Sequence, residues 1–120
     1  MMQKENEITL EKKGDVTIMD IKGDITAFSD PFLNQAYQEA THLGNRKIIL
    51  KSNKEAYINS GGIALLIQLL ARIKSNDQQV VIAGISDHFK KIFDMVGITK
   101  FAPIYDSEEA ALQNLAADTK

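Results

Sequence analysis

The sequence contains no cysteine, no tryptophan and only two prolines among its 120 residues. The absence of cysteine excludes disulfides and thiolate metal sites. The longest apolar run, residues 63–70, is interrupted by Gln68 and is far shorter than the roughly 20 residues that span a bilayer. The formal net charge is only −2, and acidic and basic residues are interspersed, so no single-signed surface favours nucleic acid or acidic membranes. We therefore expect neither nucleic-acid binding nor membrane insertion.

Length and composition favour one globular domain over residues 1–120. A hydrophobic fraction of 44% is enough for a modest core in a chain of this size. The N-terminal residues are polar and lack the apolar segment of a signal peptide. We therefore expect a cytoplasmic protein, as a monomer or weak dimer.

Strand and helix patterns alternate along the chain. Apolar and β-branched runs predict strands at 8–12, 16–21, 46–50, 79–83 and about 101–105, the first two joined by a hairpin turn at 13–15. Apolar spacing typical of helices follows residues 30, 60, 86 and 106. Because parallel strands require crossovers, this alternation predicts an α/β fold with a mixed, mostly parallel sheet of four to five strands and about four α-helices.

Polar residues at the expected helix starts predict the caps. Asp30 before Pro31 and Ser86 are expected to be N-caps, and Asp106 with Glu109 has the spacing of a capping box. The polar stretch 51–55 is expected to be an exposed loop that faces a partner.

Residues 58–63, Ile-Asn-Ser-Gly-Gly-Ile, form a small polar turn that begins an almost wholly apolar helix. A helix start has unpaired N–H groups and the positive end of the helix dipole. The Ser60 hydroxyl can therefore cap this helix or, once phosphorylated, have its dianion stabilised there. Gly61 and Gly62 either permit close packing of the helix start or expose the backbone to a partner.

No combination of residues predicts catalysis. His42 and His88 are isolated and are expected on helix surfaces, Gly61-Gly62 lacks the lysine of a P-loop, and Ser60 has no recognisable His and Asp partners. We expect a protein that is not an enzyme and that has no cofactor and no metal site.

The order of motifs resembles the STAS domain. Gly23-Asp24-Ile25 after the second strand, residues 58–62 at the helix start, and the segment from Ile85-Ser86 to Val96-Gly97-Ile98 carry this resemblance over about residues 8–115. The chain is similar in particular to bacterial anti-sigma factor antagonists of the SpoIIAA and RsbV type.

The resemblance implies partner switching without catalysis. In these families the unmodified antagonist binds an anti-sigma factor, usually a serine protein kinase, and frees the sigma factor. Phosphorylation of the serine at the helix start breaks that complex, and a PP2C-type phosphatase resets it. Ser60 aligns with the phosphorylated serine. The implied partner surface contains Asp24, Thr26, Asn59, Ser60, Gly61, Gly62, Ala64 and Gln68.

Two positions depart from the family motif, which usually reads Asp-Ser-Ser/Thr-Gly. Asn59 stands in place of the acid, and Gly61 in place of the second hydroxyl residue; Thr26 also stands where the family often has an acid. A second hypothesis is therefore a non-switching STAS subunit of a lipid-transport ABC system or of a stressosome-like assembly, in which Ser60 only caps the helix. A small ligand-binding or enzymatic domain is the third and least supported hypothesis.

Overall fold

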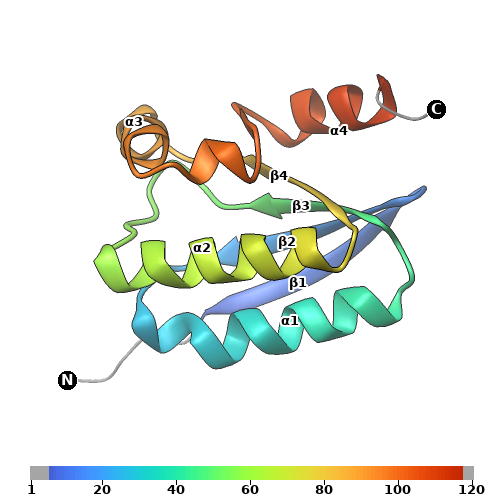
Figure 1. Cartoon of the computed structure of the whole chain (residues 1–120), viewed down its shortest axis with the longest axis horizontal. Helices are drawn as coiled ribbons and strands as arrows, with labels where there is room; N and C mark the ends of the chain where they lie inside the picture. The colour runs from blue at the N-terminus through green and yellow to red at the C-terminus, as the bar shows by residue number, and fades with distance from the viewer. Residues whose placement is uncertain (1–5, 118–120) are drawn as a thin grey trace.

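A computed structural model describes residues 6–117. Within this range, five strands form one sheet in the order β1-β2-β3-β4-β5, which is also their order along the chain. Figure 1 labels the first four of them. β1 is antiparallel to β2, and the remaining pairs are parallel. The mixed, mostly parallel sheet is thereby confirmed. The strands are Glu7–Lys13 (β1), Val16–Lys22 (β2), Lys47–Lys51 (β3), Gln79–Ala83 (β4) and Ile104–Tyr105 (β5).

Four α-helices connect or follow these strands in the described range, as predicted, together with two short 3-10 helices. No helix among residues 6–117 is both long and apolar enough to cross a membrane. The α-helices are Asp30–His42 (α1), Ser60–Ser75 (α2), Asp87–Met95 (α3) and Glu108–Ala117 (α4), and the 3-10 helices are Ala27–Ser29 (η1) and Ile98–Lys100 (η2).

The sheet has a core on each face. Neighbouring side chains of a strand point to opposite faces, so a strand covered on both sides is apolar throughout. In β3, Ile48 and Leu50 join the larger core with side chains from α1, α2 and α3, whereas Ile49 joins a smaller core beneath α4. β2 is followed by α1, and β3 is followed by α2. The carboxyl ends of both strands lie at the end of the sheet where these two helices begin (Figure 1).

An ion cluster attaches α4 to the sheet. Glu108, whose side chain is 16% exposed, accepts hydrogen bonds from Lys13 Nζ at 2.6 Å and Lys51 Nζ at 3.0 Å. These hydrogen bonds lower the pKa of Glu108 below its ordinary value, and the pKa values of both lysines are raised in return. The cluster therefore favours the charged forms on both sides.

We expect Glu108→Gln to destabilise the protein at neutral pH by less than about 1 kcal/mol, because the cluster is partly solvated. Since the folded-state pKa of Glu108 is lowered, its contribution is complete above the ordinary glutamate pKa of about 4.3 and is lost as the pH falls through the lowered value. Urea unfolding of the parent and of Glu108→Gln, at pH 7 and at a series of lower pH values, measures the difference in their free energies of unfolding. The difference should vanish in acid, whereas Glu109→Gln, at an exposed neighbour, should show no such difference at any pH.

The helix caps differ in part from the prediction. Ser86 caps α3 as predicted, with its Oγ accepting from the Phe89 N–H at 3.3 Å. Asp30 is not the N-cap of α1, because η1 precedes it and Asp30 is already the first residue of α1. The predicted capping box of Asp106 and Glu109 is also wrong, since Ser107 Oγ accepts from the Ala110 N–H at 3.1 Å.

The polar stretch 51–55 is only partly an exposed loop. Lys51 is the last residue of β3. Ser52 is buried, and its N–H continues the pairing with β4 by donating to Ala83 O at 3.0 Å. Residues 53–55 are exposed.

Candidate functional site

Two segments that are distant in sequence meet at the start of α2. Ile25, after β2, and Ile58, before α2, form an isolated parallel β-bridge. The Ile25 N–H donates to Tyr57 O at 2.9 Å, and the Asn59 N–H donates to Ile25 O at 3.2 Å. The loop after β2 is therefore held beside the turn that carries Ser60.

Asn59, not Ser60, caps α2. Its backbone is extended, and its Oδ1 accepts from the Gly62 N–H at 2.9 Å. Ser60 is the first helical residue and is exposed. Of the two roles considered for the Ser60 hydroxyl, capping is therefore wrong. Asparagine and serine are comparable caps, and the bridge to Ile25 selects the position before Ser60.

We expect Asn59→Ala to destabilise the protein by about 1 kcal/mol, the usual cost of losing a side-chain cap. Asn59→Asp should retain stability, because a carboxylate oxygen accepts the same Gly62 N–H and is favoured at a helix start. Chemical denaturation of the three proteins measures this. Equal stability of Asn59→Ala and the parent would contradict the cap.

The two glycines allow the helix start to lie against the loop after β2. A Cβ on Gly62 would lie 2.1 Å from Ile25 O, a distance that no side chain tolerates. A Cβ on Gly61 would lie 3.1 Å from both Ala27 Cβ and Ala27 N, which is tight but much less severe. Gly62 is therefore required for close packing, and Gly61, half-buried, contributes to the outer surface.

Asp24 and Thr26 organise the loop beside Ser60. Asp24 is exposed, and its Oδ1 accepts from the Tyr57 N–H at 2.9 Å. Thr26 begins η1 with a reciprocal capping box, in which its Oγ1 accepts from the Phe28 N–H and its own N–H donates to Ser29 Oγ. Both residues lie in the cluster predicted from sequence, and both also hold the backbone.

Ser60, Ala64 and Gln68 form an exposed stripe along α2. They are spaced by four residues, so they lie on one face of the helix, and all three are exposed. The structure thus brings all eight predicted partner residues together, six at the helix start and two along the stripe. Gly62 is buried, so we call the other seven residues, with the surface between them, the Ser60 surface.

Two aromatic residues of this region were missed by the sequence analysis. Phe28 is 63% exposed and Tyr57 is 58% exposed. Tyr57 precedes Ser60 by only three positions. This closeness in sequence could have indicated that Tyr57 belongs to the candidate site. Exposure of Phe28 could not be inferred, because an aromatic before a predicted helix is as often part of the core.

Neither histidine belongs to the Ser60 surface. His42 and His88 are both exposed, as expected, and lie on α1 and α3. Within residues 6–117, no group of three or more His, Asp or Glu side chains could hold a metal ion. The Ser60 surface therefore offers a hydroxyl and contact area and shows no activated nucleophile.

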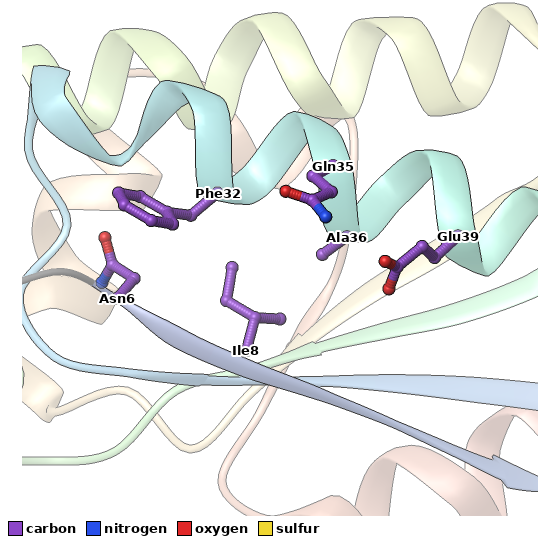
Figure 2. Close-up of a pocket in the computed structure, with 6 residues that line it drawn as sticks. All are labelled: Asn6, Ile8, Phe32, Gln35, Ala36 and Glu39. Carbon is purple, nitrogen blue, oxygen red and sulfur yellow. The ribbon is translucent and has the colours of Figure 1, made fainter.

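A pocket of about 190 Å³ lies elsewhere, between β1 and α1. Figure 2 shows Phe32, Gln35, Ala36 and Glu39 of α1 above Asn6 and Ile8. Glu39 is the one ionisable side chain of this lining, so the lining holds no pair of acid and base. None of the predicted site residues lines it.

The comparisons agree with the fold and with the sequence motifs. Residues 7–111 match the STAS domain family. The anti-sigma-B factor antagonist of Staphylococcus aureus is 22% identical over 89 residues, which cover 74% of this chain and 82% of that protein.

Solved structures share the fold. An anti-sigma factor antagonist from Mycobacterium paratuberculosis superposes with a TM-score of 0.75 at 16% identity, covering 91% of this chain and 92% of that chain. SpoIIAA of Bacillus in its phosphorylated form gives a TM-score of 0.64 at 18% identity, covering 91% and 99%. With the family match extending over nearly all the described residues, the chain belongs to the STAS domain family, and the relatives named above are anti-sigma factor antagonists.

Proposed function

We propose that this protein is an anti-sigma factor antagonist that acts by partner switching. Its unmodified form binds an anti-sigma factor of the serine-kinase type through the Ser60 surface. Phosphorylation of Ser60 by that kinase ends the complex, and a PP2C-type phosphatase restores the binding form. The names of its relatives support the antagonist role.

The observation that carries the proposal is that Asn59, and not Ser60, caps α2. Asn59 Oδ1 accepts from the Gly62 N–H, so the Ser60 hydroxyl is not needed as the cap. Ser60 is exposed at the first helical position. Modification of Ser60 therefore leaves the cap intact. A phosphate there adds about −1.5 to −2 charge in the middle of the contact surface and is stabilised by the helix start.

The departures from the family motif are compatible with this chemistry. With Asn59 in place of an acid, the residue before Ser60 has no negative charge that opposes the new dianion. Asp24 is then the acidic residue in the Ser60 surface, and its Oδ1 is engaged by the Tyr57 N–H.

The test begins with protein purified from its own cells. Intact-mass and fragment mass spectrometry should find a phosphate on Ser60, and an ATP-binding anti-sigma factor should copurify with the unmodified fraction only. Incubation of the complex with ATP should then release the antagonist as phosphate appears on Ser60, whereas Ser60→Ala should stay bound. A stable complex with a protein that is not a kinase, together with Ser60 that is never modified, would instead favour a scaffold subunit.

A further inference from the structure

The Ser60 surface is flanked by two of the most exposed large hydrophobic side chains of the described residues, Phe28 and Tyr57. We propose that this aromatic pair inserts into apolar pockets of the anti-sigma partner and provides most of the binding affinity, while Ser60 provides the switch. The inference rests on the proposed function and assigns separate roles to neighbouring parts of one surface.

Phe28 is held in place by the loop that reaches the helix start. Its N–H donates to Thr26 Oγ1 at 3.1 Å inside the capping box of η1. The preceding residue, Ala27, lies against Gly61, where an added Cβ would come within 3.1 Å. The Phe28 backbone is therefore fixed next to the first turn of α2, while the residue as a whole remains 63% exposed.

Tyr57 is held by the same loop after β2. Its N–H donates to Asp24 Oδ1 and its carbonyl accepts from the Ile25 N–H, both at 2.9 Å. Its ring packs edge-on against Phe89, with 5.9 Å between ring centroids. One side of the ring is thus anchored on the core, and the rest, 58% of the residue, is open to solvent.

This arrangement has the properties of interface anchors. Exposed aromatic rings supply a large apolar area, and residues of this type dominate binding energy when they fill partner pockets. Because both backbones are already fixed, little conformational entropy remains to be lost on binding. The occupant is then a protein surface with an apolar pocket for each ring beside a site that reaches the Ser60 hydroxyl.

Leu43 offers a matched control. It is 40% exposed, but it follows the last residue of α1, at the end away from η1. The 13 residues of α1 place it about 20 Å along the helix axis from the helix start. The Ser60 surface and Leu43 thus lie towards opposite ends of α1 (Figure 1).

The experiment introduces the photocrosslinker p-benzoylphenylalanine singly at positions 28, 57, 64 and 43 of the full chain in its own cells. We expect crosslinks from positions 28, 57 and 64 to one ATP-binding anti-sigma factor, identified by mass spectrometry, and none from position 43. Crosslinks from position 64 alone would overturn the anchor role and leave the proposed function standing. No crosslink to such a protein from any position would count against both, and crosslinks from 28 and 57 to a second copy of the chain would replace the inference with a dimer.

Affinity measurements with the anti-sigma factor so identified complete the test. Phe28→Ala and Tyr57→Ala should each weaken binding at least about tenfold, and Leu43→Ala should have no effect. Each variant should still release its partner when Ser60 is phosphorylated. Thermal unfolding of each variant separates lost contact from lost folding, and Phe28→Ala, at the more exposed position, is decisive if Tyr57→Ala is unstable. Unchanged affinity of Phe28→Ala would overturn the proposal.

Discussion

Ser60→Asp is expected to lower the affinity for the anti-sigma partner by at least about thirtyfold without any loss of stability. The aspartate introduces a permanent negative charge where the unmodified surface has a neutral hydroxyl. A charge that is desolvated or placed against a like charge in an interface costs about 2 kcal/mol or more, which corresponds to this change in affinity.

The expected stability has a separate physical reason. Ser60 is the first residue of α2, and an acidic side chain there interacts favourably with the helix dipole. The cap is unaffected, because Asn59 Oδ1 still accepts the Gly62 N–H. Isothermal titration calorimetry with the purified partner should therefore show weaker binding of Ser60→Asp, whereas chemical denaturation of the free protein should show no loss of stability.

Two variants serve as controls for Ser60→Asp. Ser60→Ala should keep both binding and stability, because the hydroxyl is not the cap. Ser60→Thr should bind and remain a substrate for the kinase. Binding of Ser60→Asp at the parent's affinity would contradict the switch, and a loss of about 1 kcal/mol in Ser60→Ala would contradict the assignment of the cap to Asn59.

Gly62→Ala is expected to destabilise the fold by about 2–3 kcal/mol, although alanine favours helices by about 1 kcal/mol over glycine. The new Cβ would lie 2.1 Å from the Ile25 carbonyl oxygen and 2.6 Å from the carbonyl carbon. Both atoms belong to backbone held by the bridge to Ile58, so they cannot move aside as a flexible side chain would. The helix start must therefore shift, which also displaces Ser60 and should weaken partner binding.

Gly61→Ala is the matched control. Its Cβ would meet Ala27 at 3.1 Å, which requires a shift of only a few tenths of an ångström, and the helix propensity of alanine offsets that cost. We expect a change within about 1 kcal/mol. Urea denaturation of Gly62→Ala and Gly61→Ala measures the loss of stability in each. Equal losses would show that the contact between the new Cβ at position 62 and the Ile25 carbonyl is not the cause.

Local patterns were sufficient for the order of the strands and α-helices, but not for the 3-10 helices η1 and η2 or for the last strand, which is shorter than the predicted 101–105. β4 has the predicted residues, Gln79–Ala83, and the hairpin turn falls at Gly14-Asp15, where Gly14 has a φ of +61°. These features depend on neighbours in sequence, such as side-chain alternation and the left-handed conformation that glycine adopts.

The caps could not be predicted from local sequence to the same degree. Asn59 and Ser60 are adjacent residues with comparable capping preference, and Thr26, Ser29 and Asp30 compete in the same way before α1. In the first case, the decision comes from a backbone contact with Ile25, which is distant in sequence. The proximity of the candidate partner residues was predictable from the motif, whereas the exposure of Phe28 and Tyr57 depends on how two loops meet.

The sequential strand order of the sheet has a consequence for how the protein folds during synthesis. Each strand pairs with the strand made immediately before it, across two residues for β1–β2 and across 20 to 27 residues for the other pairs. Because the entropic cost of closing a loop rises only slowly with its length, each of these pairings has a modest cost. The sheet can grow from the β1–β2 hairpin by adding one strand at a time at the edge next to the newest residues. All eight predicted partner residues lie between positions 24 and 68, so the ribosome has made them before β4 and β5 complete the sheet.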